Sequence, residues 1–408
     1  MIRLLFLMVP VLIYADNLKS LLDYATQNSD LVVSKALSQK AKASEVESSK
    51  SAYYPTIDVG AFYQSVEERT PMEAGDVYSG FAKVSFDIYD GGKKSAQLSQ
   101  RKNEYKASNF DSESIKKSLS LQIVQDFFNI KSLKASLASR EEARRSLLQQ
   151  LTRMKRFYTA KIATSDDVDR LQSAYDTNIY EMESIKFQII SEKKSLELKV
   201  GKNIETLDDS KFKEFAKQTK ELIDSVKSLM ALKEAMVDSA ESVESVYYPQ
   251  LKIEDTFSVY DYGRSDANHL ESVDNQNKLL LSLNMRIFDK GTVAKSKQAI
   301  LINSQALSTQ VSYSKKEQKM RYDLALSAID TSNIKIKSAK SALIAATSAF
   351  KTISKKYDAG IVDNVVYLDA LTSQTEAKAI YETSINDLQI AYAVYYYYAG
   401  KNIEEFLQ

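Results

Sequence analysis

Two very long stretches of the sequence contain neither glycine nor proline, the residues that most often interrupt helices. The first runs from Lys93 to Val200, and the second runs from Thr292 to Ala359. A helix from Lys93 to about Phe157 is roughly 95–100 Å long at about 1.5 Å per residue. Helices of this length are typical of coiled coils, in which apolar residues recur in steps of three and four. Such steps occur at Leu147, Leu151, Met154 and Tyr158, and at Ile385, Leu388, Tyr392, Tyr395 and Ala399.

Several short sequences occur twice, half a chain apart. The sequence "GKNIE" begins at Gly201 and again at Gly400, a spacing of 199 residues in a chain of 408. "YDGG" is echoed by "FDKG" and "YTAKI" by "YDAGI" at the same spacing, while "SAYYP" returns as "SVYYP" after 194 residues. Because these pairs follow one another in the same order, they indicate a tandem duplication of a unit near 200 residues, longer than an ordinary solenoid repeat.

A short turn divides the long helical stretch of each unit into a helical hairpin. The turns are "TAKIATSDD" and "DAGIVDN". Thr164 together with Asp167 predicts a helix N-cap in the first unit, and Asp363 predicts one in the second. Gly201 and Gly400 are expected to end the returning helices as C-terminal cap glycines.

Apolar and polar residues alternate in four segments, two in each unit. We expect strands at about 55–67, 77–89, 249–260 and 278–288. Alternation over 10–12 residues fits transmembrane β-strands with one face toward lipid, but also ordinary hairpins with one wet face. The pattern alone does not decide between them. The long helices, and the signal peptide described below, favour the membrane.

Four strands cannot close a barrel, since an open edge is not tolerated in lipid and the smallest barrels have eight strands. Two or three chains would have to share one barrel.

The first residues predict export from the cytoplasm. Arg3 precedes an apolar run from Leu4 to Tyr14, which is too short to span a bilayer and is typical of a signal peptide at residues 1–15. The mature protein is expected to begin near Asp16.

The amino-acid composition excludes several classes of function. The 55 Lys and Arg residues balance 54 Asp and Glu residues, so no net charge would recruit nucleic acid. Cysteine is absent and the one histidine, His269, lies in a polar loop. Thiol chemistry and a histidine metal site are therefore excluded, and no nucleophile–base pair or phosphate loop is present. We expect no enzyme activity, no cofactor and no metal.

The C-terminal sequence "YDAGIVDNVVYLDALTSQTEAKAIYETSINDLQIAYAVYYYYAG" resembles the TolC family of outer-membrane efflux and secretion channels. The "YYP" strand entries, the "DGG" and "DKG" joints and the duplicated hairpins resemble it too. The resemblance implies a homotrimer with a shared 12-stranded barrel in the outer membrane and a 12-helix tunnel in the periplasm. It also implies an equatorial layer and, as partners, a periplasmic adaptor and an inner-membrane pump. The organisation it implies is a first repeat at 16–205 (hairpin 92–200), an equatorial segment at 206–225, a second repeat at 226–404 (hairpin 291–399) and a tail at 405–408.

Three positions depart from the family pattern. Its Asp-Val-Leu-Asp-Ala run corresponds to Val366–Ala370, so the first Asp is missing, and in the first unit Arg170 stands where the second Asp belongs. Lys161 replaces the turn glycine that the second unit keeps as Gly360.

The resemblance places the functional residues at the hairpin turns. The candidates for a gate are Asp167, Arg170, Asp369 and Tyr357. The candidates for adaptor docking are Ala160, Lys161, Ile162 and Ala163 in the first turn and Ala359, Gly360, Ile361 and Val362 in the second. Helix capping by Asp166, Asp167 and Asp363 and plain turn geometry are the simpler alternatives.

The sequence leaves two questions open. An exported structural coiled-coil protein of the cell envelope would share the signal peptide and the long helices, although it has no use for four alternating strands. Within the channel interpretation, drug efflux and type I protein secretion are not distinguished.

Overall fold

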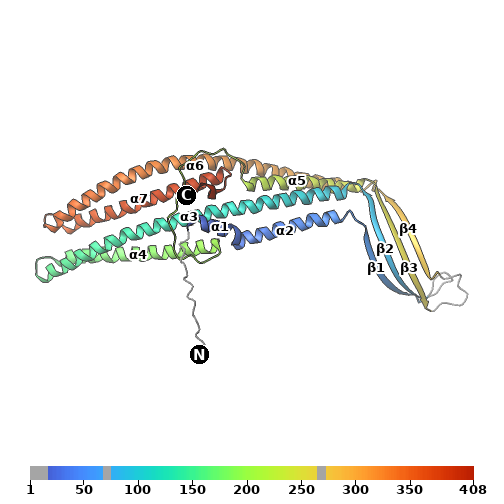
Figure 1. Ribbon diagram of the computed structural model, residues 1–408, viewed down its shortest axis with the longest axis horizontal. Coiled ribbons are helices and arrows are strands. Elements are labelled where there is room, and N and C mark those ends of the chain that lie inside the picture. Colours follow the sequence, from blue (N-terminus) through green and yellow to red (C-terminus); the bar gives the residue numbers. More distant parts are fainter. Residues whose placement is uncertain (1–16, 68–74, 264–272) are drawn as a thin grey trace, which may run out of the picture. The chain divides into compact units, whose positions relative to one another are not determined.

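The computed structural model describes residues 17–67, 75–263 and 273–408. The expected signal peptide and His269 lie outside the described residues. The described chain is mainly helical, with one antiparallel sheet of strand order β1-β2-β3-β4 (Figure 1), and this confirms the predicted fold class. The elements are α1 (Leu18–Asn28), α2 (Asp30–Ser51), β1 (Thr56–Ser65), β2 (Asp76–Asp90), α3 (Lys93–Thr159), α4 (Ser165–Val200), α5 (Asp224–Glu244), β3 (Gln250–Gly263), β4 (Asn275–Asn284), α6 (Thr292–Asp358) and α7 (Asn364–Tyr398).

The two helical hairpins match in length. α3 and α6 each have 67 residues, while α4 has 36 and α7 has 35. α4 ends at Gly201, whose left-handed φ of 87° is unfavourable for residues with a Cβ, and Gly400 follows α7 with φ of 81°. The two copies of "GKNIE" therefore begin where the returning helices end, as the sequence predicts.

The chain forms two compact units, which are described separately. The sheet unit comprises Leu37–Asp111 and Ser225–Ser314, and it contains all four strands. The hairpin unit comprises the chain up to Ala36, Ser112–Asp224 and Lys315–Gln408, and it contains both helical turns.

Aromatic residues form the core of the hairpin unit. Phe127 and Tyr395 are fully buried, and Leu196 and Val200 of α4 pack into the same cluster. Tyr396 stacks on Phe406 at a centroid distance of 3.8 Å. The tyrosine-rich end of α7 is thus core, which agrees with the simpler interpretation of that run.

A strap at residues 201–223 connects the two repeats and lies against the end of the chain. Phe212 forms an isolated bridge with Leu407, and the Gln408 amide donates to the Lys211 carbonyl at 3.0 Å. In the core, the Gln218 amide donates to the Tyr395 hydroxyl at 2.7 Å. The predicted equatorial segment and the predicted tail therefore contact each other.

Side-chain contacts set the order of the helices in the hairpin unit as α4, α3, α7, α6. Asn178 of α4 donates to the Arg140 carbonyl of α3 at 3.0 Å. Lys378 of α7 pairs with Glu142 of α3 at 2.7 Å. Phe350 of α6 lies 5.7 Å from Tyr367 of α7, measured between ring centroids. α4 and α6 are the two outermost helices of this order.

Equivalent aspartates join the strands to the long helices in the sheet unit. Asp90 accepts hydrogen bonds from the amides of Gly92 (3.1 Å) and Lys94 (2.8 Å). Asp289, 199 residues later, accepts from the amides of Gly291 and Val293, both at 2.9 Å. Each aspartate satisfies amides in the first turn of its helix, which explains the repeated "YDGG" and "FDKG" sequences.

Candidate functional site

The two turns of the hairpin unit have equivalent backbone conformations. Lys161 has a φ of 58° and Gly360 has a φ of 73°, so the lysine adopts the left-handed conformation for which the second turn uses glycine. The Thr164 hydroxyl and the Asp167 side chain form a capping box at the start of α4. Asp363 caps α7 by accepting from the Val366 amide at 3.0 Å. The predicted caps are confirmed.

Most of the predicted docking residues are exposed. Ile162 is 73% exposed and Ile361, at the equivalent place in the second turn, is 70% exposed. Ala163 and Val362, at equivalent places in the two turns, are half-buried, and Val362 packs on an aromatic cluster beneath its turn. Each turn thus presents one exposed isoleucine, a feature that a partner protein could contact.

Tyr357 lies inside that cluster and not on the surface. Its ring stacks on the Tyr367 ring at a centroid distance of 4.7 Å, and the Arg153 guanidinium lies 5.7 Å from the centre of the Tyr357 ring. Arg153 also forms an ion pair with Asp358. Burial raises the pKa of the Tyr357 hydroxyl, which has no hydrogen-bond partner among the described residues. Tyr357 is the second-to-last residue of α6, and its ring packs against Tyr367 of α7.

The three charged gate candidates differ in their local partners. Asp167 is occupied in the capping box, and its carbonyl accepts from Asn364 of the second hairpin at 3.2 Å. Arg170 pairs with Asp166 at 2.9 Å, and this hydrogen bond raises the pKa of the guanidinium. Asp166 thus pairs with Arg170 and lies in the first turn of α4, where an acidic side chain also complements the helix dipole. Asp369 is exposed on α7. The structure brings Asp167 near the second turn and leaves Asp369 open to contacts from outside the chain.

One face of the sheet is largely apolar. The strand register places Ile57, Val84 and Leu279 in one row and Ile253 beside Leu281 in the next. Val59 is 80% exposed and Leu281 is 62% exposed. We call this side the apolar face. Asp255 and Asp261 interrupt it, and we have no structural explanation for Asp255.

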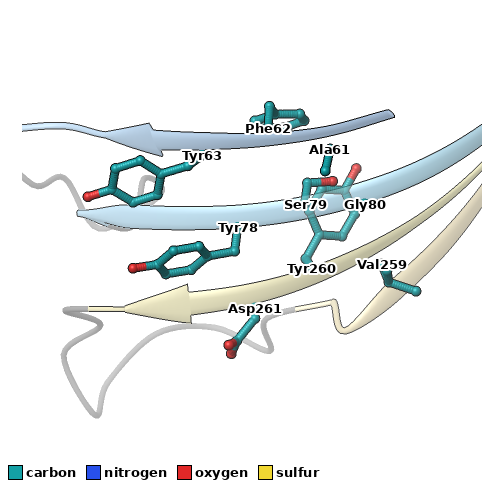
Figure 2. Close-up of a pocket in the computed structure, with 9 residues that line it drawn as sticks. All are labelled: Ala61, Phe62, Tyr63, Tyr78, Ser79, Gly80, Val259, Tyr260 and Asp261. Carbon is teal, nitrogen blue, oxygen red and sulfur yellow. The ribbon is translucent and has the colours of Figure 1, made fainter. Parts of the chain in front are cut away.

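Tyrosines border the apolar face at both ends. Tyr63 and Tyr78 stack at 4.9 Å near the loops, as Figure 2 shows, and Tyr89 lies at the other end of β2. Tyr78 and Tyr89 are about 36 Å apart along the strand at about 3.3 Å per residue, or about 28 Å along the membrane normal for a strand tilted by about 40°. The apolar band therefore has about the height that a bilayer requires, with aromatic residues where a transmembrane barrel carries them.

The opposite side of the sheet, the polar face, carries paired charges. Lys252 pairs with Glu254 at 2.9 Å, and Ser85 donates to the same carboxylate at 3.2 Å. Asp87 pairs with Lys94 at 3.1 Å. Alternation of an apolar outer side with a polar inner side is typical of strands in a membrane barrel.

Two searches within the described residues gave negative results. None of the helices there combines the length and the apolar character that a membrane span needs. The described residues also hold no group of three or more His, Cys, Asp or Glu side chains arranged to bind a metal ion.

The fold is that of bacterial outer-membrane channel subunits. The CmeC outer membrane channel of Campylobacter jejuni matches with a TM-score of 0.82 at 14% identity, covering 94% of this chain and 85% of CmeC. The outer membrane protein VceC of Vibrio cholerae matches with a TM-score of 0.79 at 14% identity, covering 95% and 96%. CusC, described as forming a transmembrane channel, matches with a TM-score of 0.80 at 13% identity, covering 95% and 93%.

Sequence comparison agrees with the fold. Residues 21–182 match the model of the outer membrane efflux protein family. A search of curated proteins finds no match. The resemblance to TolC-type outer-membrane efflux channels is therefore confirmed, in sequence over these residues and in fold over nearly the whole chain. The matched family is one of outer membrane efflux proteins, which agrees with the predicted location in the outer membrane.

Proposed function

We propose that three copies of this chain form an outer-membrane channel that carries substrates from a tripartite pump across the periplasm and the outer membrane. The observation that carries the proposal is the sheet, which exposes an apolar band of bilayer height and, among the described residues, has β1 and β4 as its edge strands. Open edges are not tolerated in lipid, so the edges must pair with other copies. Three copies supply twelve strands, the number that the family resemblance implies.

The polar face of the sheet would then line the barrel, and the two hairpins of each copy would continue it as a tunnel. The fold shared with channel subunits over most of the chain supports this arrangement. The substrates are drugs, other small molecules or proteins, and the pump that supplies them sets the choice between efflux and type I secretion.

The turns are the proposed gate and docking points. Exposed Ile162 and Ile361 would contact a periplasmic adaptor at equivalent places in the two hairpins. Asp369, Asp167 and Arg170 would close the tunnel by polar links between neighbouring hairpins. Tyr357 would contribute as an internal support, because its side chain is buried.

Membrane fractionation tests the proposal. We expect the expressed protein to enter the outer-membrane fraction, to migrate differently on gels before and after heating, and to form pores in planar bilayers. A soluble periplasmic or surface-attached protein without pore activity would support the alternative, a structural coiled-coil protein of the envelope, and would refute the channel.

Conductance tests the gate. We expect Asp369→Ala and Arg170→Ala each to raise the single-channel conductance in planar bilayers, because each removes a polar group from the narrowest part of the tunnel. Asp208→Ala is the control, since Asp208 is an exposed charge in the strap. Unchanged conductance in a variant that carries both substitutions would remove these residues from the gate.

A further inference from the structure

The polar face of the sheet changes in character along the strands. From the helices to the middle of the sheet its rows carry charges, and the strand register places Asp58, Lys83 and Lys278 in one such row. Toward the loops, the following rows carry aromatic rings. We call these rings the aromatic cluster: Phe62 of β1, Phe81 of β2, and Tyr260 and Tyr262 of β3.

Small residues in the same rows make room for the rings. Gly60 lies opposite Phe81, and a Cβ on Gly60 would lie 2.6 Å from the Phe81 ring, so this ring covers the glycine. Ser79 lies between Phe62 and Tyr260 in the register and is only 5% exposed. Its hydroxyl has no hydrogen-bond partner among the described residues. The alternation of large and small residues therefore keeps the rings close to the sheet.

The rings differ in how firmly they are held. The rings of Tyr260 and Tyr262 are stacked, with centroids 6.2 Å apart and an angle of 20° between their planes. The Tyr262 hydroxyl also donates to the Val273 carbonyl at 3.2 Å. Phe62, by contrast, is 46% exposed. The cluster thus combines an ordered pair of tyrosines with a phenylalanine that is open to solvent.

Contact with lipid does not explain these rings. Residues opposite each other in the register share a face, so the cluster lies on the same side of the sheet as Lys252 and Glu254. In the proposed barrel this side lines the lumen, where polar side chains are typical. A group of exposed apolar side chains on such a surface indicates contact with another molecule.

An acidic residue gives the cluster a preference for positive charge. The Tyr260 amide donates to the Asp274 carbonyl at 2.9 Å, so Asp274 lies beside Tyr260, just before β4 begins. Asp274 is exposed and interacts electrostatically with Tyr262. Among the described residues in the rows of the cluster, Asp274 alone is charged. Both its carboxylate and the faces of the rings attract cations.

We propose that the aromatic cluster and Asp274 form a contact site for flat organic cations on the inner wall of the barrel. The ring system of such a solute stacks on Phe62 and Tyr260, and its positive charge is attracted by Asp274. The inference rests on the proposed channel and adds a class of solute that the channel wall recognises. With three copies, the site occurs three times around the lumen.

Weak binding suits a site in a conduit. Conduction requires that a solute bind well enough to enter and weakly enough to leave. Contacts between cations and exposed aromatic rings are weak in this sense. A solute would therefore be held briefly near the loop end of the barrel and then released.

Block of the channel in planar bilayers tests the site. Ethidium, a flat aromatic cation, should reduce the single-channel current of the wild-type protein when it is added on the side that the loops face. Phe62→Leu keeps an apolar side chain and removes the aromatic face, so it should raise the half-blocking concentration about fivefold. Tyr260→Leu should have a similar effect, whereas Phe62→Tyr retains a ring and should behave as the wild type does.

A matched variant and a second probe provide the controls. Tyr63→Leu alters an aromatic residue next to Phe62 that lies on the apolar face, so it should leave ethidium block unchanged. Naphthalenesulfonate, a flat aromatic anion, should block the wild type more weakly than ethidium does. Asp274→Asn should reduce this difference. Equal block of the wild type by both probes would overturn the preference for cations.

The outcomes separate this inference from the channel proposal. Wild-type pores that ethidium does not block, or pores of the two leucine variants that it blocks as well as the wild type, would overturn the contact site and leave the channel proposal intact. The rings would then only fill the space over Gly60 and Ser79. Absence of pores from the wild-type protein would refute both proposals.

Discussion

Leu281→Arg is expected to prevent stable incorporation into the outer membrane. Leu281 lies on the apolar face of β4, and an arginine that faces lipid in a transmembrane barrel costs about 2–4 kcal/mol near the bilayer midplane. A trimer carries the substitution three times, so the penalty is about threefold larger. The amount of protein in the outer-membrane fraction, and its heat-modifiable band, measure the effect.

The neighbouring residue provides the control. Leu280 has nearly the same depth but lies on the polar face, opposite Glu254. Leu280→Arg places a positive charge beside an acid and should leave incorporation near the wild-type level. Equal behaviour of the two variants would show that the two faces of the sheet do not meet different environments.

Gly91→Ala is expected to destabilise the sheet unit strongly. Gly91 has a φ of 71°, and a Cβ at this position would lie 2.4 Å from the Ser245 carbonyl oxygen, a backbone atom. The left-handed conformation costs a non-glycine residue about 1–2 kcal/mol, and overpacking adds about 1–3 kcal/mol. The temperature at which the assembled protein dissociates on gels should fall clearly.

Gly92→Ala separates the two causes. Gly92 has a φ of 85°, and its added Cβ would meet nothing within 4 Å. This variant should therefore show only the conformational cost of about 1–2 kcal/mol. A loss as large as that of Gly91→Ala would contradict the role of the Ser245 carbonyl. The second joint has Lys290 at the position of Gly91, with a φ of 56°, so the conformation alone does not require glycine.

Local signals explain why much of the fold could be predicted. The absence of helix-breaking residues identified α3 and α6, and the capping residues identified the turns. Alternation identified the strands, but the pattern continues to Ile287 while β4 ends at Asn284. Asn284 faces Gln250, the first residue of β3, so the residues after Asn284 have no partner on that strand. Strand ends depend on such partners, which alternation does not reveal.

The candidate site was predictable only in part. Asp167 and Asp363 cap helices through neighbours a few residues away, and short-range patterns show this. Tyr357 is buried by Tyr367 and Leu147, which belong to other helices. The residues next to Tyr357 in the sequence therefore did not reveal that it is buried, unlike the exposed gate candidates.

The pairing of the strap with the end of the chain also has a consequence for biosynthesis. Leu407 is 4% exposed, and residues 211–213 form hydrogen bonds with Phe406 and Gln408. Residues 406–408 are synthesised almost 200 residues after residues 211–213, so the strap lacks these partners during that length of chain synthesis. The strap can therefore complete its packing only late in synthesis, and a chain without residues 406–408 would leave Phe212 without its bridge to Leu407.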